Sequence, residues 1–155
     1  MNLDKREARA RNNAYSLLRS RPRSEAEMRG RLRLKGYDDA IIDGVIDGLK
    51  RVGDIDDLKF AKLWVESRMH LNPAGDIVLR QELKEKGIAD SIIEATLEEK
   101  AKSYDEYEVA SSMARERFER LKKLDRRKAM KRLYDFLSRR GFKYETVSRI
   151  IDELK

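Results

Sequence analysis

The chain has 155 residues, of which 42% are charged and only 7% aromatic, and it contains no cysteine. This composition excludes a disulfide framework and thiol chemistry. With only 2 Pro and 8 Gly it also argues against an all-β fold, which needs many turns. It favours helices that combine a narrow apolar stripe with a wide solvated face.

No apolar run approaches the roughly 20 residues of a membrane span, and the N-terminal segment lacks the apolar stretch of a signal peptide. We therefore expect a cytoplasmic protein that has no contact with a membrane.

The net charge of +7 is unevenly distributed along the chain. Residues 1–35 carry 11 basic and 4 acidic side chains, and residues 110–155 carry 15 and 7. Acids outnumber bases in both segments between them, by 7 to 2 in residues 36–58 and by 11 to 8 in residues 59–109. This segregation indicates two kinds of contact, one with nucleic acid and one with protein.

The first predicted helix runs from Lys5 to Ser20 and stops before Pro22, because the residue before a proline avoids the helical region. Ser24 is expected to cap the second helix, with Glu27 completing a capping box. This helix ends at Gly36.

The third helix extends from Asp38 to Gly53 and presents an apolar stripe at helical spacing. The fourth opens at Asp56 or Asp57 and is broken at Asn72–Pro73. Its expected buried side chains are Phe60, Leu63, Trp64 and Met69.

The remaining five helices follow the same pattern. The fifth ends at Gly87, and Asp90 is expected to cap the sixth. The seventh spans residues 105–122, and the eighth runs from a cap at Asp125 to Gly141. The ninth contains the last apolar stripe, at Val147, Ile150, Ile151 and Leu154.

One pattern recurs around Gly36, Gly87 and Gly141. A leucine lies four residues before each glycine, and an apolar residue directly follows the glycine. These two residues are Leu32 and Tyr37 for the first glycine, Leu83 and Ile88 for the second, and Leu137 and Phe142 for the third. The glycines are 51 and 54 residues apart, a period typical of repeat proteins. We predict an all-α fold of three tandem three-helix repeats, 1–53, 54–103 and 104–155, that form an elongated, curved monomer.

Signs of catalysis are missing from the sequence, which has no Walker A loop, nucleophile elbow or zinc-protease motif. His70 is the only histidine and is expected at a solvated helix end. The acidic run 54–57 fails the EF-hand pattern and is interpreted as a helix cap. Trp64 could stack on a base, but a place in the core is the favoured interpretation. We expect no enzyme activity, catalytic residue, cofactor or metal.

Two basic stretches, in residues 19–35 and 115–143, are the strongest functional signal. Their alternative interpretation is a solvated surface with intrahelical ion pairs, but few acids are nearby to balance them. Arginine predominates in the first stretch and suits bidentate contact with phosphate or carboxylate. The candidate binding residues in these stretches are Arg19, Arg21, Arg23, Arg29, Arg33, Lys35, Arg126, Arg127, Lys131, Arg139 and Arg140.

Four segments resemble the RecX family, the bacterial regulators of the RecA recombinase. They are Arg-Pro-Arg-Ser-Glu at 21–25, Phe-Ala-x-x-Trp-x-x-x-Arg at 60–68, Glu-Leu-x-x-Lys-Gly-Ile at 82–88 and Arg-Gly-Phe at 140–142. The resemblance covers residues 14–154 and implies tandem three-helix repeats. It also implies a non-enzymatic protein that binds RecA filaments on single- or double-stranded DNA. Such a protein inhibits recombination, RecA ATP hydrolysis and RecA coprotease activity in DNA repair and the SOS response.

The resemblance adds Arg68 and Lys86 to the candidate contacts with RecA or DNA, beside Arg23 and Lys35. Many family members carry several Lys, Arg and Gly residues before the fifth helix. Here residues 70–76 hold no positive charge other than that of His70, so a phosphate contact from this loop is not expected. The alternative functions are a DNA-binding protein that acts independently of RecA and a pure structural scaffold.

Overall fold

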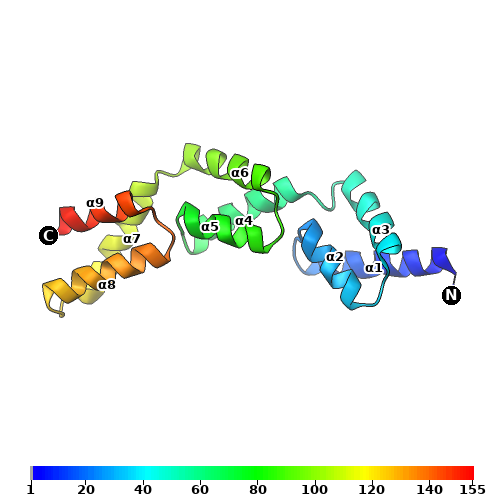
Figure 1. The fold of residues 1–155 in the computed structure, drawn as a ribbon, viewed down its shortest axis with the longest axis horizontal. Helices are drawn as coiled ribbons and strands as arrows, with labels where there is room; N and C mark the ends of the chain where they lie inside the picture. The colour runs from blue at the N-terminus through cyan, green and yellow to red at the C-terminus, as the bar shows by residue number, and fades with distance from the viewer. Residues whose placement is uncertain (1) are drawn as a thin grey trace. The chain divides into compact units, whose positions relative to one another are not determined.

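The computed structural model describes residues 2–155, and within that range the chain forms nine α-helices and no strand (Figure 1). The predicted all-α fold is therefore confirmed. The helices are α1 (Leu3–Ser20), α2 (Glu25–Leu34), α3 (Asp39–Arg51), α4 (Asp57–Leu71), α5 (Asp76–Glu85), α6 (Asp90–Ser103), α7 (Glu106–Leu121), α8 (Arg126–Arg139) and α9 (Tyr144–Leu154). None of the helices in residues 2–155 has the length and apolar character that crossing a bilayer requires.

The chain folds into two compact units. The first comprises residues 1–63 and 83–92, and the second comprises residues 64–82 and 93–155. Their boundaries fall inside α4, α5 and α6, so the three middle helices contribute residues to both units. The repeat boundaries and the curvature expected from the sequence remain predictions.

Each end of the chain has its own hydrophobic core. In the first unit, α1 contributes Ala10 and Ala14, α2 contributes Met28 and Leu32, and α3 contributes the stripe expected from the sequence. In the second unit, small residues of α7 allow close packing against α8 and α9, and the core is Ala110, Ala114, Leu121, Ala129, Met130, Leu133, Leu137, Phe142, Val147, Ile150 and Ile151.

The three glycines of the repeated pattern end their helices in the left-handed conformation, as predicted. Gly36, Gly87 and Gly141 have φ angles of 91°, 77° and 89°. After each of them, the next backbone N–H donates to the carbonyl of the leucine four residues before the glycine, at 3.2, 3.1 and 3.4 Å. This is the Schellman motif, and it brings the apolar residue after the glycine back to that leucine. The repeated sequence pattern therefore encodes one helix end three times.

At two of these helix ends, a carbonyl accepts a hydrogen bond from the segment just before α2 or α5, and the two contacts are equivalent. Ser24 and Gly75 each lie twelve residues before the glycine of their own repeat. The Ser24 hydroxyl donates to the Lys86 carbonyl at 2.7 Å, and the Gly75 N–H donates to the Arg140 carbonyl at 2.8 Å. Both acceptors directly precede the glycine of the following repeat. At both junctions a hydrogen bond therefore ends on a carbonyl at the end of a helix, where carbonyls lack partners within the helix.

Several helix starts and burial predictions differ from expectation. Helix α1 begins at Leu3, two residues earlier than predicted, because the Asn2 side chain accepts the Lys5 N–H at 2.9 Å. Asp90 is the first residue of α6 rather than its cap. Leu63 was expected to be buried, but it is 44% exposed, and Val65 is buried instead.

We predict that Gly75→Ala destabilises the protein. An added Cβ would lie 2.3 Å from the Gly141 carbonyl oxygen and 2.6 Å from the Phe142 nitrogen, and neither backbone atom can move without disturbing the helix end. The expected loss is about 1–3 kcal/mol, measured by thermal or urea unfolding. The matched control is Gly48→Ala in α3, where an added Cβ meets no atom within 4 Å. That substitution should stabilise by about 0.5–1 kcal/mol, and equal losses for both variants would contradict the close packing.

Candidate nucleic-acid and protein interface

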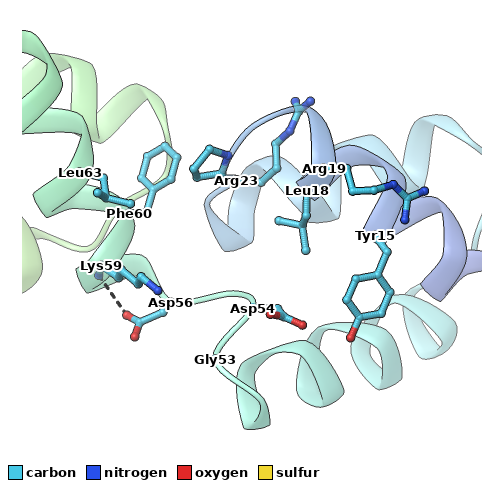
Figure 2. Close-up of a pocket in the computed structure, with 11 residues that line it drawn as sticks. Tyr15, Leu18, Arg19, Arg23, Gly53, Asp54, Asp56, Lys59, Phe60 and Leu63 are labelled. Carbon is cyan, nitrogen blue, oxygen red and sulfur yellow. Dashed lines mark hydrogen bonds between the residues drawn. The ribbon is translucent and has the colours of Figure 1, made fainter.

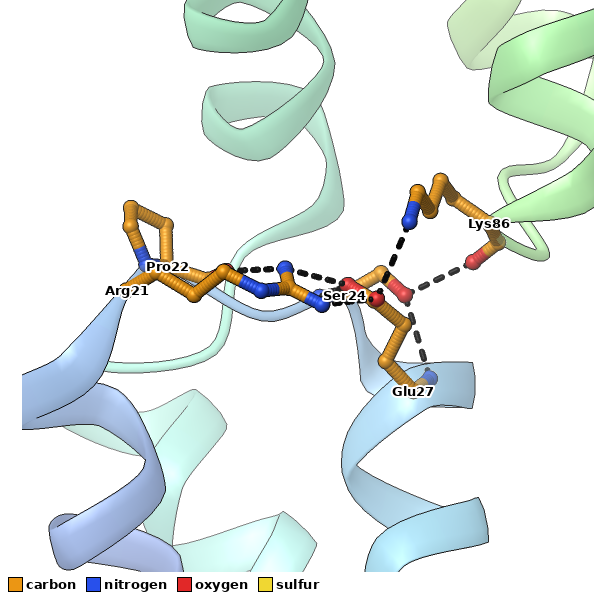
Figure 3. A network of polar contacts seen from close by, with 5 residues as sticks. All are labelled: Arg21, Pro22, Ser24, Glu27 and Lys86. Carbon is orange, nitrogen blue, oxygen red and sulfur yellow. Dashed lines mark hydrogen bonds and ion pairs between the residues drawn. The ribbon is translucent and has the colours of Figure 1, made fainter.

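Glu27, in the first turn of α2, is the centre of an ionic network that includes two of the candidate cations (Figure 3). Arg21 donates to both of its carboxylate oxygens, at 3.2 and 2.6 Å. The Lys86 ammonium lies 3.3 Å from one oxygen, and the Ser24 N–H completes the capping box at 3.2 Å. Arg21 and Lys86 are thus paired with a carboxylate of the same molecule, beside the hydrogen bond that joins the start of α2 to the end of α5.

The ionic network lowers the pKa of Glu27. Burial alone would raise the pKa, but hydrogen bonds from Arg21 and the Ser24 N–H, together with attraction by Arg21 and Lys86, outweigh it and hold the pKa below the ordinary value. The carboxylate therefore stays ionised and contributes stability at neutral pH.

The acidic segment 36–58 folds back onto the first basic stretch. Arg29 of α2 donates to Asp43 of α3 at 2.7 Å and lies 3.6 Å from Glu25. Arg33 donates to Asp39 at 3.2 Å. The segregation of charge along the sequence is therefore partly cancelled in space. The Arg33–Asp39 pair is largely solvent-exposed, and such pairs contribute little to stability.

The acidic run before α4 caps helices, as expected. Asp56 accepts the Lys59 N–H at 3.1 Å, and Asp57 accepts the Glu25 N–H at 2.9 Å. Burial is the main cause that raises the pKa of Asp57 above its ordinary value. In residues 2–155 no three acidic or histidine side chains are grouped closely enough to hold a metal ion.

On α4, Trp64 and Arg68 share one acceptor. The Trp64 indole N–H and the Arg68 Nε both donate to Oε1 of Glu82 in α5, at 3.1 and 2.9 Å. Trp64 is half-buried rather than fully in the core. Arg68 also donates to the Asn72 carbonyl at 2.6 Å, so its guanidinium fixes the end of α4. His70 is exposed in the last turn of this helix, as expected.

Arg140, at the end of α8, is also held within the molecule. It donates to the Asn72 side chain and lies 3.4 Å from the Pro73 carbonyl. Its guanidinium and that of Arg117 lie 5.4 and 4.8 Å from the centre of the Phe136 ring. Burial, followed by repulsion from Arg68 and Arg117, lowers the pKa of Arg140.

Helix α8 keeps a face of cations that have no acidic partner. Lys128, Arg132 and Arg139 are four and seven residues apart, so they point within about 40° of one another around a helix of 3.6 residues per turn. The buried residues Ala129, Met130, Leu133 and Leu137 lie on the opposite side. All three cations are exposed, and no carboxylate within the described chain comes within 4 Å of them. We call them the α8 basic face.

The other candidates of the third repeat surround this face. Lys131 is 4.0 Å from Asp135 in an exposed pair, and Arg126 donates to the Leu154 carbonyl. Arg127 is exposed. The N-terminus of α8 has three cations and no acid in its first turn, and the Asp125 side chain makes no capping hydrogen bond. Asp125 therefore occupies the predicted N-cap position without capping the helix through its side chain, and the helix dipole adds to the positive potential there.

In the first repeat, Arg19 and Lys35 are exposed and Arg23 is buried. Sequence reasoning placed Lys128 and Arg132 in a basic stretch but did not select them as candidates. Their spacing from Arg139 carried the necessary signal, because it matches the helical period and avoids the apolar positions.

We predict that Glu27→Gln lowers the melting temperature. The change removes the charge that Arg21 and Lys86 share, at an expected cost of about 1–2 kcal/mol, or on the order of 5 °C. Because the pKa of Glu27 is depressed in the fold, the difference from wild type should be complete at pH 7 and should shrink as the pH falls below about 4. Glu116→Gln is the matched control, since its exposed pair with Arg120 should contribute less than about 0.5 kcal/mol. Equal effects of the two variants would contradict the role of the network.

Three family models match the chain in succession. They describe the first, second and third three-helix domains of RecX and match residues 10–49, 56–97 and 104–151. The regulatory protein RecX of Prosthecochloris aestuarii is 35% identical over 146 residues, which is 94% of this chain and 93% of that protein. The regulatory protein RecX of Clostridioides difficile is 33% identical over 94% of this chain and 68% of its own length.

The fold has a counterpart among solved structures. The crystal structure of RecX from Lactobacillus salivarius superimposes with a TM-score of 0.84 at 25% identity, over 98% of both chains. The order of the three domain matches, the identity over nearly the whole length and the shared fold agree. The chain therefore belongs to the RecX family of regulatory proteins.

Proposed function

We propose that this protein is a non-enzymatic regulator that binds RecA–DNA filaments and inhibits RecA recombinase, ATPase and coprotease activity. Its family membership and the name of its relatives, regulatory protein RecX, support this proposal. The setting would be DNA repair and the SOS response in the bacterial cytoplasm.

The α8 basic face carries the proposal as a structural feature. Three exposed cations on one outward helix face repel one another and add nothing to the core, so an anionic partner is the role that this face supports best. Such a face suits DNA phosphates or an acidic protein surface. In contrast, Arg21, Arg29, Arg68 and Lys86 already have carboxylate partners in the molecule.

The structure therefore shifts the emphasis among the candidate contacts. From the sequence, both basic stretches are candidate contacts with RecA or DNA. Because α3 supplies Asp39 and Asp43 to the first stretch, the third repeat offers the larger free positive charge. We propose that the third repeat makes the main anionic contact and that Arg19, Lys35 and the exposed Arg33 assist it.

We predict that replacing Lys128, Arg132 and Arg139 with Gln weakens inhibition of RecA ATP hydrolysis on single-stranded DNA at least about tenfold. This magnitude follows from the loss of three charge contacts worth on the order of 0.5 kcal/mol each. The measurement is the concentration of this protein that halves the ATPase rate. The matched control replaces Arg9, Arg51 and Lys62, which are exposed and have no acidic partner within 4 Å in residues 2–155, with Gln. Undiminished inhibition by the α8 variant would refute the assignment of this face.

A second measurement distinguishes DNA contact from RecA contact. The affinity for bare DNA decreases with salt. If the α8 basic face binds phosphates, the slope of log affinity against log salt should become less steep by about 2–3 in the α8 variant. If the face meets acidic RecA surface, the slope should stay unchanged while inhibition is lost. Inhibition only when the protein covers the DNA stoichiometrically would favour the alternative function, a DNA-binding protein that acts without RecA.

A further inference from the structure

A cavity of about 380 Å³ opens in the first unit between the end of α1, the segment that leads into α2 and the start of α4 (Figure 2). Its apolar walls come from Tyr15, Leu18, Pro22, Phe60 and Leu63. Leu63 is 44% exposed, so apolar surface continues from the cavity to the outside. We call this cavity the Arg23 pocket, after the cation in its wall.

Arg23 is the unusual member of the lining. Its side chain is 93% buried, since only 7% of the residue is exposed, and its Nε has no hydrogen-bond partner. Within residues 2–155 no carboxylate comes within 4 Å of its guanidinium. Burial, and then repulsion from Arg21 and Arg31, lowers its pKa. A buried polar atom without an acceptor inside the protein favours a partner that arrives from outside.

The fold itself does not need this cation. Arg23 lies thirteen residues before Gly36, and the residue at the same place before Gly87 is Ala74, which is fully buried. Pro22 and Pro73 correspond in the same way. A second cavity, of about 480 Å³ and lined by Pro73, Asp105 and Glu108 among others, has no Lys or Arg in its lining. The corresponding position of the second repeat therefore carries no positive charge.

The charges in the Arg23 pocket select the kind of anion. Arg19 and Lys59 also line it, but so do Asp54 and Asp56. Figure 2 shows Arg23 and Phe60 on one side of the pocket and the two aspartates on the other. A nucleic-acid strand, which carries a phosphate at every nucleotide, would be repelled by the aspartates. A single carboxylate beside an apolar group would meet the cation and the apolar wall together.

We propose that the Arg23 pocket binds a peptide segment of a partner protein that pairs a carboxylate with the Arg23 guanidinium and packs an adjacent apolar side chain against Pro22, Phe60 and Leu63. The interaction does not depend on the proposed regulation of RecA, because any protein that presents such a segment would meet the same chemistry.

The test uses the full chain, labelled with ¹⁵N, and no RecA. The probe is the dipeptide N-acetyl-phenylalanyl-glutamate amide, and its neutral counterpart carries glutamine. We expect the glutamate dipeptide to shift the amide signals of residues 23–24 and 59–63 and to bind at least about tenfold more tightly than the glutamine dipeptide, as expected for loss of one charge-assisted hydrogen bond. Equal binding of the two dipeptides, or no shift in these signals, would overturn the proposal.

Two variants separate binding from folding. Arg23→Met keeps the length of the side chain but removes its charge, so dipeptide affinity should fall at least about tenfold while the melting temperature stays unchanged or rises. Arg31→Met makes the same charge change at an exposed position and should leave affinity intact. A lowered melting temperature for Arg23→Met would indicate a structural role instead. A single-stranded oligonucleotide that shifts the same signals more strongly than the dipeptide would also reject a peptide ligand.

Discussion

The structure depends on the way that a helix ends. A glycine in the left-handed conformation closes the middle helix of each repeat and leaves a carbonyl pointing outward just before the turn. At two of the three ends that carbonyl accepts a hydrogen bond from the segment before the preceding repeat's middle helix. The same turn therefore stops a helix and provides the place where the neighbouring repeat is attached. The close approach of Gly75 to Gly141 and of Gly87 to Ala26 follows from it.

Much of the fold is predictable from the sequence because its signals are local. Glycine, proline and capping residues act over three or four neighbours, and the apolar stripes follow the helical period. The sequence could not reveal which cations are neutralised. The pairs between Arg29 and Asp43 and between Lys86 and Glu27 join residues 14 and 59 positions apart, and they exist only after the helices have packed. Counting charge along the chain therefore overstates the free positive charge of the first repeat.

Burial of single residues was harder to predict in α4. Leu63 of α4 was expected to be buried, but packing buries Val65 and leaves Leu63 exposed. Trp64 is only half-buried because its indole N–H needs a hydrogen-bond acceptor, which Glu82 supplies at the surface. The α8 basic face follows from spacing alone. Its three residues are among thirteen basic residues in positions 115–143, and so dense a stretch gives no reason to prefer one face.

The hydrogen bonds of Ser24 and Gly75 to the following repeat differ in how they can change during evolution. Ser24 donates through its side chain, so one nucleotide substitution can remove that bond or replace its donor, and the stiffness of the first connection can drift between lineages. Gly75 donates through the main chain, which every residue type except proline retains, but the position has no room for any side chain. The second connection is therefore almost fixed by geometry, and adaptation of how the repeats move is expected to accumulate at the first.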